Sequence, residues 1–443
     1  MKILLFFLYF PILVIAQNFS LSSQNVHFDG QTLKLSGDIC LDHDIGKLKA
    51  KDARFEKEQN GKLSHIFLKG DVELVLKTGG RLTSETAYVD LNKQTIELSS
   101  ANKKIIFEDF QLADKTPLFL SGHKVKCRLK STSLQKASLQ DVIFLSFYDN
   151  VEITYDTDFH VNGDKAKYAK GKNGNGEIFI YAKSKSCRLS YHENEATASF
   201  CHILLDDQKL ELKNSKGYYN TPFGLMNFSS EKLYFDKLQE KITLEKNIII
   251  ENASIGKLHA EQVEISKNKL KTDGKTKLTF PDHKTQISCQ GHAILDNTKK
   301  ILVVKALHDD EQVLLQDEDI TILTDQLLVH YEKNLKIKEM ILEGNIRASI
   351  NASGNMTYGY ADKIIYSFIN KDLVFTSEPD KRVVFWQDSN QMKLSTKELK
   401  ITKSRNIEGI GNVRFSFDIA EGKYFKKMFS KYMKKYERNA KSQ

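Results

Sequence analysis

The chain has 443 residues, with 66 Lys and Arg against 57 Asp and Glu, so its formal net charge is +9. Only 5 Pro and 23 Gly occur, which excludes a collagen-like chain and argues against a disordered one. The 5 Cys are scattered without a C-x-x-C pair, so the sequence predicts neither a disulfide-dense scaffold nor a zinc site, although one or two bridges remain open.

The first element is an apolar N-terminus, MKILLFFLYFPILVIAQ. One Lys precedes an apolar run from Ile3 to Ile15, which is the order of a secretory signal peptide, and we expect cleavage after Ala16. An uncleaved anchor is the alternative. The run is shorter than the roughly 20 apolar residues that a spanning helix needs, and Pro11 interrupts it. We therefore expect residues 1–16 to be removed from an exported, soluble chain.

Six later segments share one pattern, in which a small or polar pair lies inside a run that alternates apolar and polar residues. The pair is Gly-Asp, Gly-Asn, Asp-Asn or Lys-Asn, and the alternation keeps its parity on both sides of the pair. The segments are LKLSGDICL (33–41), IFLKGDVELVL (66–76), IFLSFYDNVEITY (143–155), ITLEKNIII (242–250), MILEGNIRASI (340–350) and IEGIGNVRFSF (407–417).

This alternation predicts strands, because successive side chains of a strand leave opposite faces, whereas a helix would scatter them around its axis. In residues 66–76, Leu68, Gly70 and Val72 occupy alternate positions that would point to one face of a strand. Charged residues occupy most of the positions that would point to the other face. Because the parity does not change at the pair, the pair is not a hairpin turn, and a Gly inside a strand more often marks a bend. We expect each long strand to bend there and to pass from one sheet to another.

The pairs begin at residues 37, 70, 149, 246, 344 and 411, and four of the five steps lie near multiples of about 33 residues. Weaker copies are therefore expected between the clear ones. A second sequence motif follows most copies of the first. It consists of a small Ala, then an alternating strand and a polar turn, as in residues 46–58, 80–98 and 256–269. Repeated strand pairs joined by polar turns predict an all-β array of about 36 strands.

These two motifs, in this order and after a signal peptide, resemble those of the organic-solvent-tolerance-A-like family of lipopolysaccharide-transport proteins. That family is typified by LptA and the N-terminal domain of LptD. The resemblance covers most of residues 33–417 and departs from the family at Asp149 and Lys246, where Gly is usual. It implies an elongated, repetitive β-jellyroll of two facing antiparallel sheets. Their open apolar trough would hold acyl chains and leave phosphorylated sugars outside.

The resemblance also implies the periplasm of a Gram-negative-type bacterium, lipopolysaccharide (through its lipid A moiety) as ligand, and strand-edge pairing with other transport components. We expect residues 17–220 and 221–420 to form two β-jellyroll repeat regions, followed by a tail at 421–443.

The apolar residues that are expected to point inward from these strands are the candidate lipid-lining residues. Burial of a methylene is worth about 0.8 kcal/mol, so a continuous apolar lining would hold acyl chains that water rejects. The alternative for each residue taken singly is ordinary sandwich core with no ligand. The candidates are Leu33, Leu35, Ile39, Ile66, Leu68, Val72, Leu74, Val151, Ile153, Ile242, Leu244, Ile248, Ile250, Leu342, Ile346, Ile350, Val413 and Phe415.

The tail predicts a basic amphipathic helix. Its aromatic and Met side chains recur at helical spacing from Phe425 to Tyr436, and residues 421–443 hold eight Lys or Arg against two Glu, or +6. Such a helix binds anionic membrane or the phosphates of lipid A, or else its apolar face caps the last open strand edge. The candidate membrane or phosphate contacts are Lys426, Lys427, Lys431, Lys434, Lys435 and Arg438.

No motif of a hydrolase, a metal enzyme or a nucleotide-binding enzyme stands in a matching context, so we predict no catalytic residue, metal or cofactor. Nucleic acid is not expected as a partner of an exported chain. The predicted function is a non-enzymatic periplasmic carrier or bridge for lipopolysaccharide. The alternative is an exported structural or adhesive β-repeat protein that binds proteins through strand edges and holds no lipid. An open interior would favour the carrier, and a fully packed one the structural protein.

Overall fold

The computed structural model of the chain describes residues 20–417 with short gaps, together with Lys427. The gaps are residues 44–45, 59–60, 62, 77–78, 94, 110–115, 130–142, 171–175, 183–185, 281–284, 309–310, 333–335, 353–354, 388–391 and 405. The predicted signal peptide and the predicted helical tail lie outside the described residues, apart from Lys427, which is helical and exposed. The predictions made for these two segments stay predictions.

The described residues form 34 strands whose recorded pairings are antiparallel, which confirms the predicted all-β fold. The chain divides into two compact units, Met1–Gly217 with Lys232–Leu238 and Tyr218–Glu231 with Gln239–Gln443. We describe each unit by itself. The predicted division into repeat regions at residue 220 stays a prediction.

Sixteen strands lie wholly in the first unit. They are β1 (Ser20–Ser22), β2 (Asn25–Phe28), β3 (Thr32–His43), β4 (Gly46–Lys57), β5 (Leu63–Leu76), β6 (Arg81–Asp90), β7 (Thr95–Ser99), β8 (Ile105–Asp109), β9 (Leu118–Gly122), β10 (Lys124–Leu129), β11 (Ile143–Tyr155), β12 (Phe159–Lys170), β13 (Gly176–Tyr181), β14 (Cys187–Tyr191), β15 (Asn194–Ala198) and β16 (Phe200–Leu204). Two strands have residues in both units, namely β17 (Lys209–Thr221) and β18 (Gly224–Asp236).

The second unit holds the remaining strands. They are β19 (Lys241–Asn252), β20 (Gly256–Ser266), β21 (Lys269–Thr279), β22 (Gln286–Asp296), β23 (Ile301–Ala306), β24 (Val313–Gln316), β25 (Ile320–Thr324), β26 (Gln326–Tyr331), β27 (Ile337–Ala352), β28 (Asn355–Ser367), β29 (Leu373–Thr376), β30 (Val383–Gln387), β31 (Met392–Thr396), β32 (Glu398–Ile401), β33 (Ile407–Ile410) and β34 (Arg414–Phe417).

In the first unit several long strands pair with different neighbours along their two halves. Residues 143–148 of β11 pair with β10, whereas residues 152–155 pair with β9. Strand β12 divides in the same way between β13 and β14, and β6 between β7 and β8. We call β8, β9 and β14, with the strand halves that pair with them, the first array. We call β7, β10, β13 and β16, with their halves, the second array.

The two arrays face each other. The ring of Phe107, on β8 of the first array, has its centroid 6.4 Å from that of Phe147 and 5.3 Å from that of Tyr168. Phe147 and Tyr168 belong to the halves of β11 and β12 that lie in the second array. Hydrogen bonding therefore joins both arrays into one sheet that folds over its own apolar side chains.

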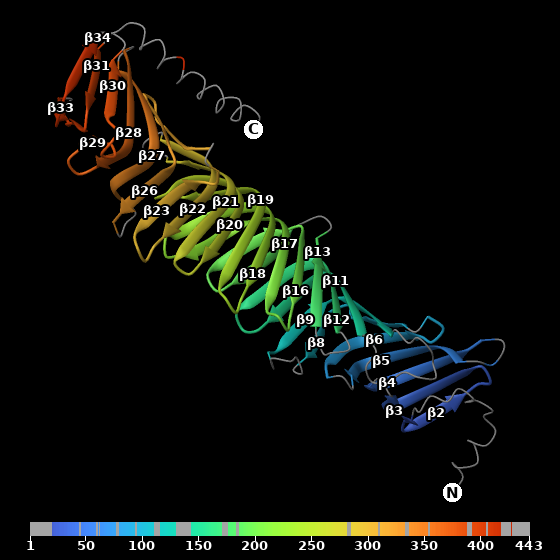
Figure 1. Cartoon of the computed structure of the whole chain (residues 1–443). Helices are drawn as coiled ribbons and strands as arrows, with labels where there is room; N and C mark the ends of the chain where they lie inside the picture. The colour runs from blue at the N-terminus through green and yellow to red at the C-terminus, as the bar shows by residue number, and fades with distance from the viewer. Residues whose placement is uncertain are drawn as a thin grey trace. The chain divides into compact units, whose positions relative to one another are not determined.

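The second unit repeats this arrangement. Residues 337–343 of β27 pair with β26 and residues 347–350 with β25. Strand β28 divides between β29 and β30, and β22 between β23 and β24. The long strands β19, β20, β21 and β22 lie side by side as antiparallel ribbons (Figure 1).

The small-polar pairs lie where the long strands change array. Both residues of the pair have left-handed backbone, as in Asp149 (φ 65°) and Asn150 (φ 54°), and the pairing register with the following strand shifts at the same point. Such a bulge puts extra residues into one strand and bends it. The five pairs that show both features are Gly37-Asp38, Gly70-Asp71, Asp149-Asn150, Lys246-Asn247 and Gly344-Asn345.

The expected bend at the pair is therefore present. At the sixth pair, Gly411 (φ 90°) lies between β33 and β34, which join different partner strands. One weaker copy is found at Gly274 (φ 81°) in β21, where the register with β20 shifts as well. We call this margin of each unit, where strands pass between arrays, the corner.

The corner residues yield a stability prediction. Gly344 has φ 82°, and an added Cβ would lie only 2.9 Å from Asp325 Cβ, so Gly344→Ala is expected to lower the unfolding free energy by at least about 1 kcal/mol. Lys246 occupies the equivalent place with φ 62°, a conformation that disfavours a side chain by about 1 kcal/mol, so Lys246→Gly is expected to be neutral or stabilising. Urea unfolding of both variants measures this, and equal destabilisation by the two would contradict the left-handed corner.

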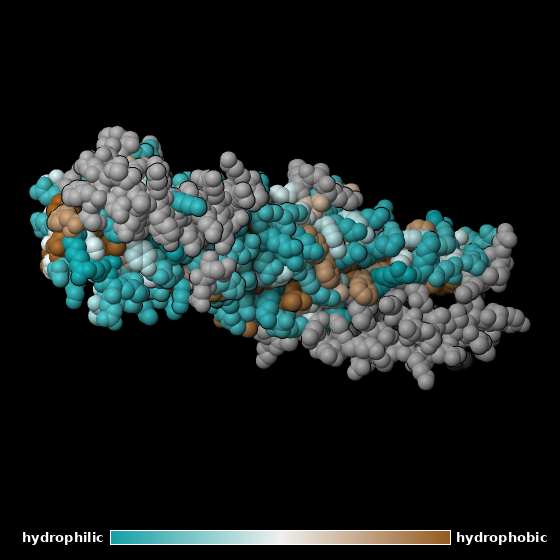
Figure 2. Space-filling view, turned by 45° about the horizontal axis from the view of Figure 1, so that its top comes forward, coloured by the Kyte–Doolittle hydropathy of each residue, from teal (hydrophilic) through white to brown (hydrophobic). Residues whose placement is uncertain are grey.

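The core lies between the arrays, as the inward parity predicts. Strand β5 alternates, with Leu68 3 % and Val72 1 % exposed on the inner face and Lys69 and Glu73 on the outer face. Figure 2 shows one face of the described surface, which is mostly hydrophilic with scattered hydrophobic residues. On that face, polar residues therefore occupy most of the outward-pointing positions of the strands. Apolar side chains occupy the inward-pointing positions.

The margin opposite the corner is formed differently. Here β8 pairs with β9, and the facing ends of β11 and β12 pair with each other, all within the first array. Strand β13 pairs with β12, and β17 pairs with β16, within the second array. We call this margin of the first unit the mouth, because in the described residues it is joined by side chains and not by a continuous strand.

Candidate functional site

The apolar interior is the candidate site, and the structure places most of the predicted lining residues inside it. Fourteen of the eighteen are at most 6 % exposed, and Leu244 and Ile346 are fully buried. These enclosed residues are Leu35, Ile39, Ile66, Leu68, Val72, Leu74, Val151, Ile153, Ile242, Leu244, Ile248, Ile250, Leu342 and Ile346.

Four predicted lining residues are less enclosed. Leu33, Ile350 and Val413 are partly exposed. Phe415 is 60 % exposed on β34, which pairs only with β31 among the described strands. Phe415 therefore lies on the surface of the last described strand and not inside the core. Whether any of these residues contacts lipid stays a prediction.

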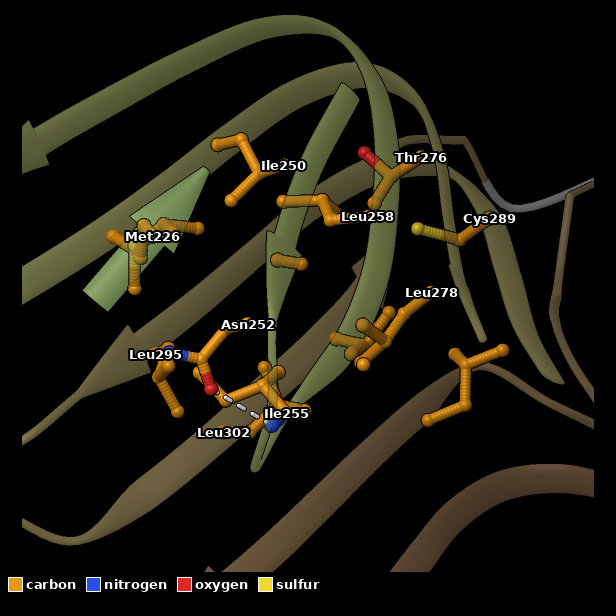
Figure 3. A pocket seen from close by; sticks show the side chains of 15 residues that line it. Met226, Ile250, Asn252, Ile255, Leu258, Thr276, Leu278, Cys289, Leu295 and Leu302 are labelled. Atoms are coloured by element: carbon orange, nitrogen blue, oxygen red, sulfur yellow. Dashed lines mark hydrogen bonds between the residues drawn. The ribbon is translucent and has the colours of Figure 1, made fainter. Parts of the chain in front are cut away.

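A small cavity lies in the interior of the second unit. In the second unit, a cavity of about 50 Å³ lies among apolar side chains that include Met226, Ile250, Leu278 and Leu295 (Figure 3). A ligand site for a small molecule usually measures about 300–1,000 Å³, so this cavity holds no acyl chain as it stands. Facing sheets lie about 10 Å apart and their side chains interdigitate, which explains the small volume.

This cavity is too small to be the open trough that the resemblance implied, and the trough stays a prediction. Asn252 is among the residues that line the cavity, and its Oδ1 accepts the Ser254 and Ile255 backbone N–H groups at 2.9 and 3.0 Å. Its amide also donates to the carbonyls of Phe223 and Leu225 at 3.2 and 3.0 Å. A ligand would have to displace packed side chains to enter.

Polar contacts cross the mouth of the first unit. The hydroxyl of Tyr155, at the edge of the first array, donates to the Leu205 carbonyl beyond β16 at 2.8 Å. Across the same margin, Asp109 Oδ2 accepts from Tyr168 Oη at 3.0 Å and from Lys170 Nζ at 3.2 Å. Asp109 is completely buried, so its charge is compensated by these two donors.

A further ion pair joins the mouth, with Lys237 Nζ lying 2.5 Å from Asp156 Oδ2. This lysine holds the pKa of the Asp156 carboxyl below its usual range, and a hydrogen bond from the Thr157 backbone acts in the same direction. At Tyr168, burial raises the pKa of the hydroxyl, and the neighbouring Asp109 charge adds to the effect. Two tyrosine hydroxyls, two lysines and two aspartates thus provide the polar contacts across this margin.

Sequence reasoning did not find these mouth residues. Asp109 falls in the stretch of residues 100–140 where the repeat is least readable. A usable signal was present at Tyr155 and Tyr168, because each carries a polar hydroxyl at a position of inward parity. A buried tyrosine hydroxyl usually has a hydrogen-bond partner, which predicts a contact even when the partner is unknown.

Among the described residues, no group of three His, Cys, Asp or Glu is placed to hold a metal ion. All five cysteines are unpaired with one another, and burial raises the pKa of Cys127 and Cys289 to about 12, which keeps these thiols protonated and unreactive. Among these same residues, no helix has the length and apolar character required to cross a membrane.

These features define the chain as a repetitive, two-layered antiparallel β protein with an apolar interior. No protein-family model matches the sequence, and no curated protein matches it. Among solved structures, it is similar to LptH from Pseudomonas aeruginosa, described as the LptA homologous periplasmic component of the lipopolysaccharide transport device. That similarity covers 31% of this chain and 96% of LptH, with 10% identity and a TM-score of 0.26.

Proposed function

We propose that the chain is a non-enzymatic periplasmic carrier or bridge for lipopolysaccharide. The observation that carries this proposal is the construction of the first unit: an apolar interior closed by continuous strands at the corner and by side-chain contacts at the mouth. An amphiphile whose acyl chains lay between the arrays would leave its sugars at the mouth. The mostly hydrophilic face that Figure 2 shows fits exposure to water.

Because the interior is packed, lipid entry requires the two arrays to separate. Separation at the mouth breaks a few polar contacts, while the hydrogen bonds within each array remain. Acyl chains then replace side chain–side chain contacts, and each methylene taken from water contributes about 0.8 kcal/mol. The closed structure is in this view the empty carrier.

Strand edges support association with other transport components. Strands β1 and β2 pair only with β3 in the described residues, and Val26 on β2 is 64 % exposed. In the second unit, β33 pairs only with β32, and its Ile407 and Ile410 are 42 % and 48 % exposed. Unpaired backbone groups beside exposed apolar side chains favour addition of a strand from a partner.

A second candidate is an exported structural or adhesive β-repeat protein that binds proteins through these edges and holds no lipid. The packed interior of the second unit favours it, because a core that never opens needs no space. The two candidates differ in what the native protein contains. Purification from its own cell envelope, followed by mass spectrometry of bound lipid, decides between them. Recovery of lipopolysaccharide supports the carrier, and a lipid-free protein supports the structural alternative.

The basic tail provides a separate prediction. Deletion of residues 423–443 removes eight Lys or Arg and one Glu, and a basic residue near an anionic membrane contributes about 1 kcal/mol. Binding to vesicles that contain anionic phospholipid is therefore expected to fall by at least about tenfold. Sedimentation with vesicles measures it, and neutral vesicles are the control. Unchanged binding would leave capping of the last strand edge as the role of the tail.

A further inference from the structure

The outer face of the first unit has a trench of about 500 Å³. Three successive residues from each of β2, β3, β4 and β5 line it. This volume lies within the range of about 300–1,000 Å³ that small-molecule sites occupy. The trench is thus large enough for a ligand, unlike the small cavity in the core of the second unit.

Strand register decides which side of the sheet the trench lies on. Val26, Leu35, Ala53 and Leu68 pair in one row across the four strands, so their side chains share one face. Leu35, Ala53 and Leu68 are 4 %, 5 % and 3 % exposed because that face is the interior. Their backbone therefore forms the floor of the trench, and the rows on either side point outward and form its walls.

One wall carries positive charge and an aromatic ring. It is the row of His27, Lys34, Arg54 and Phe67, all of which are exposed. The Arg54 guanidinium carbon lies 4.8 Å from the centroid of the Phe67 ring, which fixes the planar cation against an apolar face. Arg54 also pairs with Glu56 beyond the wall, and this pair engages only part of its five N–H donors.

The opposite wall is mixed. It is the row of Asn25, Ser36, Asp52 and Lys69, which provides an amide, a hydroxyl, a carboxylate and an ammonium. The trench as a whole therefore holds three permanent cations against one carboxylate. Cations on both walls suit phosphate, and the amide, hydroxyl and carboxylate groups suit the hydroxyls of a sugar.

We propose that this trench binds a phosphorylated saccharide on the outer face, at a site separate from the mouth, where the sugars of an enclosed amphiphile would lie. Arg54 and Lys34 contact phosphate from one wall and Lys69 from the other. Phe67 provides an apolar surface beside the sugar ring, and Asn25, Ser36 and Asp52 face its hydroxyls.

Isothermal titration of the full chain with a phosphorylated glucosamine disaccharide that lacks acyl chains tests the site. The double variant Lys34→Gln, Arg54→Gln is expected to raise the Kd by at least about tenfold, because it removes two charge-assisted contacts. The matched control is Lys47→Gln, Lys49→Gln, which removes two charges from exposed positions on β4 outside the trench. This control is expected to change the Kd by less than about twofold.

A variant that is expected to bind more tightly tests whether misfolding explains the weaker binding of the double variant. Asp52→Asn removes the only carboxylate from the trench walls and is expected to tighten binding by about threefold. Three results would overturn the proposal: equal binding of the unphosphorylated disaccharide, equal binding of inorganic phosphate alone, or the same loss in the control as in the trench variant. Preference for an acidic peptide over the disaccharide would likewise overturn it.

The failure of this inference is distinguishable from failure of the proposed function. Native protein that contains lipopolysaccharide but shows no binding of the disaccharide retains the carrier function and loses the trench site. Native protein that contains no lipopolysaccharide, yet binds the disaccharide through Arg54 and Lys34, loses the carrier function and retains a saccharide site.

Discussion

Leu342→Asp is expected to abolish co-purification of lipopolysaccharide. Leu342 is 1 % exposed on the inner face of β27, so the new carboxylate would lie between the arrays. An unpaired charge in an apolar environment is strongly unfavourable, by several kcal/mol, and acyl chains would not be retained beside it. Leu68→Asp is expected to act in the same way in the first unit, where Leu68 is 3 % exposed.

The control for this experiment lies one residue away. Ile341 is partly exposed and points to the other side of β27, so Ile341→Asp adds the same charge outside the interior. Circular dichroism establishes which variants are folded. If Leu342→Asp does not fold, Leu342→Thr places a hydroxyl there and is expected to reduce bound lipid without removing it. Full lipid recovery from a folded Leu342→Asp protein would show that the interior is not the lipid site.

Weakening the mouth is expected to speed lipid uptake by about tenfold. Tyr155→Phe and Lys237→Gln together remove a hydrogen bond and an ion pair that join the two arrays. The two contacts are worth about 1–3 kcal/mol, and each 1.4 kcal/mol raises the open population about tenfold. Stopped-flow fluorescence with a labelled acyl-chain amphiphile measures the rate.

Tyr331→Phe is the matched control for the mouth variants. Its hydroxyl donates to the Asp296 carbonyl at 3.0 Å, but β26 and the C-terminal half of β22 both pair with β23 and so lie in one array. Loss of that bond leaves the contact between arrays unchanged, and uptake should stay at the original rate. Equal rates for all the variants would mean that lipid does not enter by separation at the mouth.

Alternation along the strands was readable from the sequence because it depends only on the two faces of a strand. Leu244 and Ile346 were placed inside on that ground and are 0 % exposed. The small-polar pairs were readable as bends because they broke the apolar row without changing its parity, and Lys246 in place of Gly did not hide the pattern.

What could not be read depends on packing between residues distant in the sequence. Asp109 meets Tyr168 and Lys170 only because two arrays close on each other, and no local pattern links residue 109 to residue 168. The tight packing around the small cavity of the second unit could not be read either, because the same inward Leu and Ile residues suit an open trough and a packed sandwich alike. The trench required the register of four strands, which alternation alone does not provide.

At the left-handed corners, long strands such as β11 and β27 pass from one array to the other, with hydrogen bonds mainly to strands close in sequence. Cooperativity in such a repeat decays from neighbour to neighbour, so damage to one copy frays its surroundings and leaves distant copies intact. Duplication of a copy likewise adds length without disturbing the existing pairs. Within either unit, chain length and the size of the apolar interior are therefore free to grow together in small steps.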